Sequence, residues 1–178
     1  MTKQAAIQEN PMRKIRVEKL TVNIGTSKEQ SKLDKGLKLI KHLTAREGVK
    51  TVSKKRIPSW GIRPGLPIGC KLTIRDSTKY DLIKKLLKAK ENVLNKKNFG
   101  QNGTVAFGIH EYIDIPDVKY EPDIGIMGFQ ACITLERPGY NIKKRRLHTA
   151  KISKKHQITK EEAISYIKSQ FGTKIEGD

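Results

Sequence analysis

The sequence predicts an α+β fold with a mostly antiparallel sheet, helices packed on one face of that sheet, and a basic C-terminal arm. Alternating apolar and polar residues at 15–24 and 68–75 are typical of half-buried strands. Apolar residues at helical spacing follow each of these strands, at 33–43 and 83–94. The order of the elements is mixed and lacks the regular βαβα alternation of a parallel sheet, so we expect an α+β domain.

The first predicted strand is 15–24, where apolar side chains alternate with polar ones. A helix is expected next, because Ser27 and Gln30 have the spacing of a capping box and a helical apolar stripe follows them. Gly48 ends this helix, and a short strand at 50–53 leads into a loop.

That loop, 54–66, is rich in residues that disfavour regular structure: Pro58, Gly61, Pro64 and Gly65. The strand after it, 68–75, has the clearest alternation in the chain, with one apolar face and one polar, cationic face. A helix with an apolar stripe flanked by lysines is predicted over 77–95.

Two further strands are predicted at 104–109 and 129–136, joined by an acidic connection that contains proline. Beyond them, Thr159 and Glu162 form a second capping-box pattern and predict a short terminal helix. We therefore expect an α+β domain over 1–136, and a basic arm with a short C-terminal helix over 137–178, docked on the same domain.

Charge is sorted along the chain. The protein has 37 Lys+Arg against 18 Asp+Glu, a formal net charge of +19. Two stretches contain no acidic residue at all, 48–75 and 137–160, whereas acidic residues are concentrated in 106–136. A solvated surface usually mixes both signs, and a surface that faces polyphosphate concentrates positive charge. Nucleic acid is therefore the expected partner.

Several other classes of protein are disfavoured by the sequence. Only Cys70 and Cys132 are present, without a CxxC pair, which disfavours a zinc knuckle and a secreted disulfide framework. No apolar run reaches the length of a membrane span, and Met1 to Met12 lacks the apolar core of a signal peptide. We expect a cytoplasmic protein with no membrane partner.

No enzymatic signature is recognisable. His110 and Glu111 lack the second histidine of an HExxH zinc site. The glycine-rich run 61–69 lacks the Gly-Lys-Ser/Thr ending of a phosphate-binding loop and precedes a strand. We expect no catalytic residues, no metal and no cofactor. An RNA-processing or RNA-modifying enzyme remains the alternative, and a DNA-compacting protein is a third possibility.

RNA binding has positive support in three places. The polar faces of two predicted strands would place amide, hydroxyl and cationic groups on one side of a sheet, although an ordinary solvated face would look the same. Trp60 lies in a stiff basic loop, where its indole could stack on an unpaired base or fold back onto the core. The tract 137–160 is polar enough to be an arm that becomes ordered on RNA, with a disordered basic tail as the alternative.

Several segments together resemble the universal ribosomal L-five family of the large subunit, at residues 10–12, 19–25, 61–75, 98–99 and 107–109. The tail from 136 to 162 is similar to the archaeal and eukaryotic branch, and most like the archaeal form. The resemblance implies a structural protein of the ribosome that binds 5S ribosomal RNA and large-subunit ribosomal RNA in the central protuberance. It also implies that the loop after 53 lies near P-site transfer RNA, and that the other partners are neighbouring ribosomal proteins and the small-subunit head.

Family members bind 5S RNA through positions that correspond here to Asn23, Trp60 and Thr73, while Val49 stands where the family has a glutamine. Together with the residues of the basic tracts, the predicted RNA-binding set is Thr21, Asn23, Trp60, Lys71, Thr73, Arg75, Arg137, Lys143, Lys144, Arg145, Arg146, Lys154 and Lys155. The set expected in the loop that contacts transfer RNA is Lys55, Arg56, Trp60 and Arg63.

Overall fold

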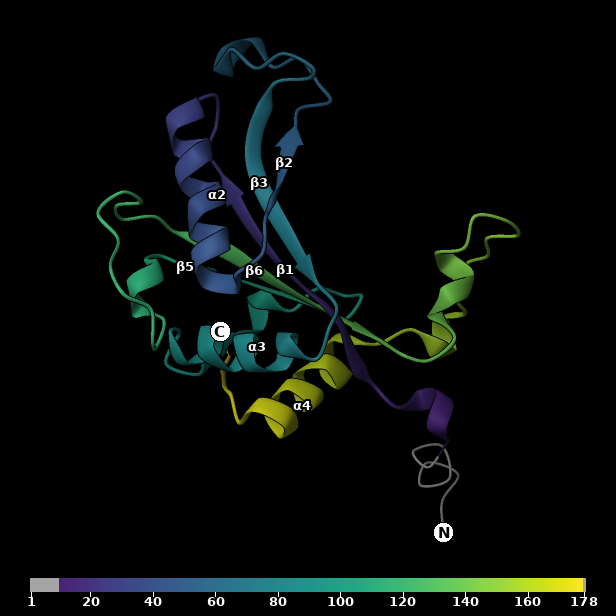
Figure 1. Ribbon diagram of the computed structural model, residues 1–178. Coiled ribbons are helices and arrows are strands. Elements are labelled where there is room, and N and C mark those ends of the chain that lie inside the picture. Colours follow the sequence, from purple (N-terminus) through teal and green to yellow (C-terminus); the bar gives the residue numbers. More distant parts are fainter. Residues whose placement is uncertain (1–9, 178) are drawn as a thin grey trace. The chain divides into compact units, whose positions relative to one another are not determined.

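The computed structural model of the protein describes residues 10–177, so most of the Met1 to Met12 segment considered above lies outside the described residues. Five strands form one sheet in the order β2-β3-β1-β6-β5, and two short strands, β4 and β7, pair separately (Figure 1). The strands are β1 (Arg16–Gly25), β2 (Val49–Val52), β3 (Pro67–Ile74), β4 (Val93–Asn95), β5 (Thr104–Ile109), β6 (Phe129–Glu136) and β7 (Lys174–Glu176).

The helices are α2 (Gln30–Thr44), α3 (Thr78–Lys88) and α4 (Lys160–Phe171). Short 3-10 turns lie at η1 (Pro11–Arg13), η2 (Pro58–Trp60), η3 (Lys96–Asn98), η4 (Tyr112–Asp114), η5 (Tyr140–Lys143) and η6 (Lys154–His156). The predicted α+β class with a mostly antiparallel sheet is confirmed. The chain forms two compact units, each assembled from separate segments: unit 1 is 10–19, 93–106 and 133–177, and unit 2 is 20–92 and 107–132.

In unit 2, helix α2 packs closely against the strand pair β1–β3. A methyl group built at Gly36 of α2 would lie 3.0 Å from the Cys70 Sγ on β3 and 3.5 Å from Ile24 on β1. Leu33, Leu39 and Ile40 complete the buried face of this helix. Burial raises the pKa of the Cys70 thiol to about 11, so the side chain is a neutral core residue at physiological pH.

The start of α2 differs from the prediction. Ser27 does not cap the helix, because it has a φ of +54° and lies in the turn before it. The N-cap is Glu29, whose side chain accepts no capping hydrogen bond. At the other end, Ala45 takes the left-handed conformation and donates its N–H to the carbonyl of Lys41, so the helix ends before Gly48.

The second helix is shorter than predicted from its apolar stripe. Helix α3 ends at Lys88, because Glu91 and Asn92 both have positive φ values of about +55°. The chain then enters β4, which pairs in parallel with β7 and not with the main sheet. Val93 and Leu94, interpreted above as helical, therefore belong to a strand.

The acidic connection 110–128 folds against the helices of its own unit. Tyr112 is fully buried, and its hydroxyl accepts a hydrogen bond from the Glu121 N–H at 2.9 Å. The Glu121 carboxylate lies 2.9 Å from the Nδ1 of His42 on α2. Asp123 pairs with Lys38 of α2 and Asp117 with Lys85 of α3. Three acidic residues of this segment thus pair with two lysines and a histidine on the helices of unit 2.

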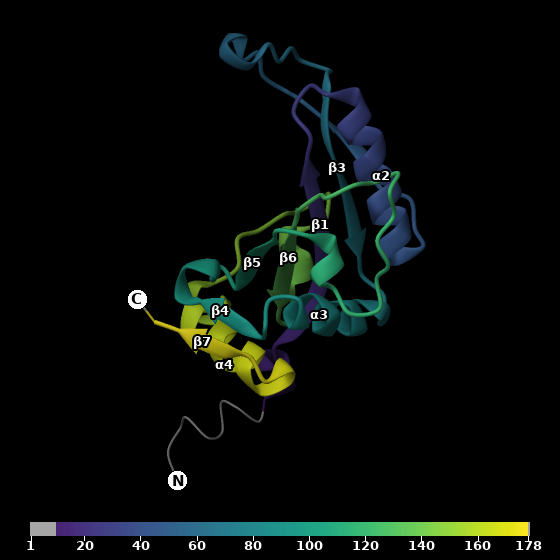
Figure 2. The ribbon, with the colours of Figure 1, turned by 90° about the vertical axis from the view of Figure 1, so that its left-hand side faces the viewer.

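In unit 1, helix α4 begins at the predicted capping box. The Thr159 hydroxyl accepts a hydrogen bond from the Glu162 N–H, and the Glu162 carboxylate accepts one from the Thr159 N–H. Gly172 ends the helix in the left-handed conformation. The chain then forms β7 alongside β4 (Figure 2). Strand β7 was not predicted.

Candidate RNA-binding surface

One face of the β1–β3 pair carries the polar residues predicted to contact RNA. The antiparallel register places Thr21 opposite Thr73 and Asn23 opposite Lys71. Residues paired across strands point to the same side of a sheet, and the buried neighbours Val22, Ile24 and Cys70 point to the other side, toward α2. We call Thr21, Asn23, Lys71 and Thr73 the polar sheet face.

Strand β2 extends this face by one row. Val49 lies opposite Lys71 in the β2–β3 register, so Asn23, Lys71 and Val49 form a line across three strands. The Val49 side chain is exposed to 64%. An exposed valine beside polar groups provides an apolar contact and no hydrogen bond. A glutamine at this position, as the resemblance implies for family members, would add a hydrogen-bonding amide to the same row.

The loop 53–66 between β2 and β3, which we call the tip loop, is ordered by its own hydrogen bonds. The backbones of Ile57 and Ile62 exchange two hydrogen bonds, at 2.9 and 3.1 Å, and the Ile62 side chain is buried. Ser53 and Gly65 close the base, with the Gly65 N–H donating to the Ser53 carbonyl. Both views show the loop extending beyond the ends of the two strands (Figures 1 and 2).

Trp60 lies at the end of the short turn η2, and 65% of its surface is exposed. The structure therefore favours the interpretation in which the indole is available for stacking over the one in which it folds back onto the core. The cationic side chains of this loop are all exposed: Lys54, Lys55, Arg56 and Arg63. Lys28 also lies beside the loop, since its Nζ is 3.7 Å from a methyl group built at Gly61. The sequence alone does not single out Lys28, because this residue lies outside the two acid-free stretches and is followed by the acidic Glu29.

The basic arm, 137–160, is anchored at its base by Arg137. This side chain is only 3% exposed. Its guanidinium donates to the carbonyls of His156 and Gln157, both at 3.2 Å, and pairs with Glu162 at 2.7 Å. Burial raises the pKa of Glu162, but the Thr159 N–H and Arg137 outweigh this, so the pKa is lowered. The geometry favours a structural role for Arg137 over direct RNA contact.

A second anchor joins the arm to β1. Glu136 accepts hydrogen bonds from Arg16 and from Lys144, and Lys144 also pairs with Glu18 at 2.7 Å. Partial burial raises the pKa of Glu136, yet the two cations more than compensate and hold this pKa below its usual value. Burial lowers the pKa of Lys144, but the contacts of this side chain with Glu136 and Glu18 outweigh that effect, so its pKa is raised. Lys144 is therefore a charged anchor within the protein.

The other predicted cations of the arm are exposed to solvent: Lys143, Arg145, Arg146, Lys154 and Lys155. Arg75, just after β3, is exposed as well. The Arg145 Nε donates to the His148 carbonyl at 2.8 Å, which orients this guanidinium. Five arm cations and Arg75 thus remain available to a polyanion, whereas Arg137 and Lys144 hold the arm in place.

No metal centre can be identified within residues 10–177, since no three His, Cys, Asp or Glu side chains converge there. Over the same part of the chain, no helix combines the length and the apolar character needed to cross a bilayer. The features that remain are the polar sheet face, the exposed indole and the exposed cations, which suit contacts with sugars, phosphates and bases.

Comparison with known proteins agrees with this chemistry. Residues 10–63 match the family model of ribosomal protein L5, and residues 67–166 match the model of the C-terminus of the same ribosomal family. The large ribosomal subunit protein uL5 of Nanoarchaeum equitans is 46% identical over 94% of this chain and 99% of that protein. The uL5 proteins of Sulfolobus acidocaldarius and Methanococcus maripaludis (strain C5) are 41% and 40% identical, each over 98% of both chains. The chain therefore belongs to the ribosomal protein L5 family.

Proposed function

We propose that this protein, a noncatalytic structural constituent of the large ribosomal subunit, binds 5S ribosomal RNA through the polar sheet face and the tip loop. The observation that supports this most directly is the register of β1 and β3, which aligns Thr21 with Thr73 and Asn23 with Lys71 on the side away from α2. Hydroxyl, amide and ammonium groups are thereby gathered on a rigid sheet, where no loop has to become ordered on binding.

Each group has a distinct role in this proposal. Threonine hydroxyls and the Asn23 amide both donate and accept hydrogen bonds, so they suit ribose 2′-hydroxyls and base edges. Lys71 and Arg75 neutralise phosphates beside them. Trp60 stacks on an unpaired base, a contact that is worth about 1–3 kcal/mol in single-stranded recognition. Shape and hydrogen bonding together provide specificity for a folded RNA.

The tip loop has a second proposed partner, the transfer RNA in the P site. Lys55, Arg56 and Arg63 are exposed around Trp60 at the far end of the β2–β3 hairpin. Cations on a projecting loop whose fold is fixed by its own hydrogen bonds can contact the backbone of a second RNA without large conformational change. The resemblance extends the partners to other proteins of the central protuberance and to the small-subunit head.

The basic arm is proposed to bind large-subunit ribosomal RNA in the central protuberance. Its exposed cations neutralise phosphates without reading sequence. Arg137 and Lys144 contribute indirectly, because they fix the arm to unit 1. Specificity is therefore assigned to unit 2, and the arm adds mainly affinity.

The proposal is tested by filter binding of 5S RNA to Asn23→Ala and Thr73→Ala variants at fixed salt. Each variant loses about one hydrogen bond, roughly 1 kcal/mol, so we expect a three- to tenfold weaker affinity. The dependence on salt should not change, because neither side chain is charged. Thr78→Ala, an exposed threonine in α3 away from the sheet face, is the matched control.

Competition with duplex DNA in the same assay distinguishes RNA recognition from general affinity for polyanions. A protein that reads RNA shape should release 5S RNA only at a large excess of DNA. Wild-type affinity in both sheet-face variants would show that the RNA-binding surface lies elsewhere. Equal competition by DNA would show that 5S RNA is not the specific partner.

A further inference from the structure

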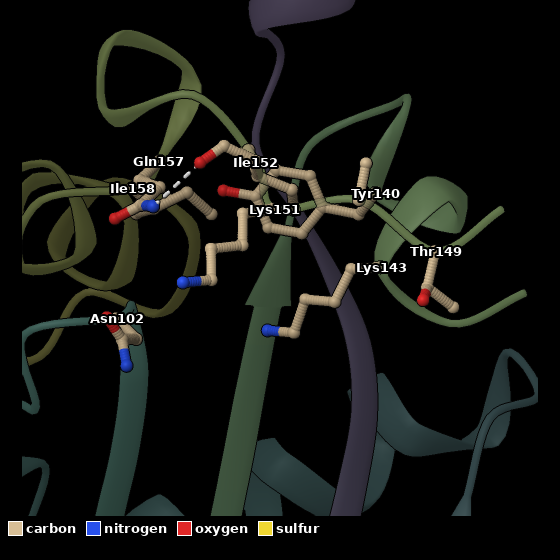
Figure 3. A pocket seen from close by; sticks show the side chains of 9 residues that line it. Asn102, Tyr140, Lys143, Thr149, Lys151, Ile152, Gln157 and Ile158 are labelled. Carbon is tan, nitrogen blue, oxygen red and sulfur yellow. Dashed lines mark hydrogen bonds between the residues drawn. The ribbon is translucent and has the colours of Figure 1, made fainter.

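Unit 1 contains a pocket of about 560 Å³ that has no role in the assignments above, although one of its lining residues, Lys143, is among the exposed cations of the arm. It lies between the turn at Asn102 and the basic arm, and it is open to solvent on one side. This volume is within the range of about 300–1,000 Å³ typical of small-ligand sites. The lining residues that matter for its chemistry are Asn102, Tyr140, Lys143, Lys151, Ile152 and Ile158 (Figure 3).

The apolar part of the pocket is built from buried side chains. Tyr140 is 9% exposed and Ile158 is 1% exposed. The Tyr140 hydroxyl donates to the His156 carbonyl at 3.1 Å, which fixes the ring. Ile158 lies against Gly103, where an added methyl group would come within 3.0 Å of it. The position of this wall is therefore set by the fold before any ligand arrives.

The wall formed by the arm is held in the same way. The Gln157 side-chain amide donates to the Ile152 carbonyl at 2.9 Å, as drawn in Figure 3. Arg137 binds the carbonyl of Gln157 from the other side. The Ala150 N–H donates to the Ile142 carbonyl, which links the two ends of the intervening turn. These hydrogen bonds give the arm between Ile142 and Gln157 a defined conformation, so this part of the chain is not a free tail.

The charged part of the pocket consists of Lys143 and Lys151. Figure 3 shows their ammonium groups extending in the same direction, toward the side where Asn102 lies. Neither lysine forms an ion pair with an acidic group of residues 10–177, whereas the adjacent Lys144 is held by Glu18 and Glu136. Two exposed cations without an acidic partner in the described part of the chain, placed beside the apolar wall of a pocket, are complementary to an anionic ligand that has an apolar body.

We propose that this pocket binds one unpaired nucleotide of a folded RNA. The base lies against Tyr140, Ile152 and Ile158. The Asn102 amide contacts the polar edge of the base. The two lysines bind the phosphates on either side of it.

Nucleotide chemistry matches all of these groups together. A base is flat, apolar on its faces and rich in hydrogen-bond donors and acceptors at its edge, and its phosphates carry the charge. An acidic peptide would satisfy the lysines but provides no flat ring with a polar edge. Because the inference takes RNA as the partner, it rests on the proposed function.

The experiment compares two RNA hairpins of the same stem, one with a single bulged nucleotide and one fully paired, by fluorescence anisotropy at fixed salt with the full-length protein. We expect the wild-type protein to bind the bulged hairpin about tenfold more tightly, the effect of one stacked base. Asn102→Ala and Lys151→Gln should each reduce this preference to about threefold.

Lys154→Gln is the matched control, because it removes the same charge from an exposed position of the arm outside the pocket. It should weaken binding of both hairpins equally and leave the tenfold preference intact. Equal affinity of the wild type for the two hairpins would overturn the inference. A preference that survives both pocket variants would overturn it as well.

Two competitors identify the source of the ligand. Free 5′-AMP should displace the bulged hairpin only at about millimolar concentration, because it lacks the flanking phosphate contacts. Displacement by micromolar AMP would reassign the pocket to a free nucleotide, and displacement by a short polyglutamate peptide at the RNA's own concentration would reassign it to an acidic protein. Tight 5S RNA binding without any preference for the bulge would refute the pocket alone, whereas failure to bind 5S RNA would refute the proposed function.

Discussion

The exposure of the Trp60 side chain in the structure favours one of two interpretations of this residue. From the sequence, an indole in a stiff basic loop is equally compatible with stacking on RNA and with folding back onto the core. In the structure the tip loop uses Ile62 as its buried residue, and Trp60 is left 65% exposed. An exposed indole flanked by cations has the chemistry to stack on a base while the cations contact the neighbouring phosphates.

We predict that Trp60→Ala weakens 5S RNA binding about tenfold or more, because a stacked base contributes about 1–3 kcal/mol. The stability of the protein should change by less than about 0.5 kcal/mol, since the side chain is mostly in solvent. Trp60→Phe keeps an aromatic face and should retain most of the affinity. Anisotropy with labelled RNA measures the first effect and urea unfolding the second. Unchanged affinity in the alanine variant would remove Trp60 from the binding surface.

Glu136 makes the stability of unit 1 depend on pH. Its pKa is lowered in the folded protein by Lys144 and Arg16, despite an opposing effect of burial. A carboxyl group with a lowered folded pKa contributes stability above its unfolded value, near 4.3, and this contribution is lost as the pH falls through the folded value. The expected window is therefore below about pH 4.3.

We predict that Glu136→Gln reduces the free energy of unfolding at pH 7 by about 1–2 kcal/mol, because the ionic character of its hydrogen bonds with two partly exposed cations, Arg16 and Lys144, is lost. The variant should lose less stability than the wild type when the pH is lowered from 5 to 3. Glu29→Gln, which removes an exposed pair with Lys32, is the control and should change stability little. Urea unfolding across this pH range provides the measurement. Parallel curves for wild type and Glu136→Gln would contradict the assignment.

At the scale of elements, the strands were predicted better than the ends of the helices. The strands at 104–109 and 129–136 agree with β5 and β6 in the structure, because alternation identifies a half-buried strand directly. The helix predicted to run to Asn95 ends at Lys88, since Leu94 has the spacing of the helical stripe but pairs instead with the distant Ile175. A local sequence pattern cannot identify a strand partner that is so distant in the sequence.

The candidate site, too, could be predicted from the sequence only in part. The polar sheet face could be predicted, because two alternating strands are enough to sort its residues from the core. The anchoring of Arg137 and Lys144 could not, because their acidic partners are separated from them in the sequence and a basic tract gives no indication of which cations are neutralised. The pocket beside Tyr140 depends on Asn102, which belongs to a different segment.

Helix α4 gives a prediction at this scale. Thr159→Ala removes the hydroxyl of the capping box and should lower the free energy of unfolding by about 1 kcal/mol. Ser165→Ala, on the exposed side of the same helix, is the control and should be neutral or slightly stabilising. Thermal unfolding followed by circular dichroism compares the two variants. Equal melting temperatures for Thr159→Ala and wild type would mean that the cap does not limit the stability of unit 1.

At the scale of the molecule, the sorting of charge along the sequence has a structural reason in unit 2. The acidic connection pairs with Lys38 and Lys85 on α2 and α3, so its carboxylates compensate part of the positive charge on the helical side of that unit. The polar sheet face and the tip loop keep their positive charge. Within the described part of unit 2, the cations of the proposed RNA surface are thus left without acidic partners, while part of the charge on the helices is compensated.

This difference between paired and unpaired cations can be tested by measuring how RNA affinity depends on salt concentration. The double variant Arg145→Gln/Arg146→Gln should reduce the slope of log affinity against log salt concentration by about 0.7–0.9 for each phosphate that is no longer neutralised. The control Lys38→Gln/Lys85→Gln removes the same charge from positions already paired with acids and should leave the slope unchanged. Filter binding with large-subunit RNA at several salt concentrations measures both. Equal slopes for the two double variants would mean that net charge alone governs binding.

The parallel pairing of β4 with β7 also determines the order in which the chain can fold during its synthesis. All segments of unit 2 have been made once residue 132 has been added, so α2, the polar sheet face and the tip loop can form at that stage. Strand β4, by contrast, must wait for residues 174–176, its partners in unit 1. A nascent chain can therefore form the surface proposed to bind 5S RNA in unit 2 before β4 and β7 pair in unit 1.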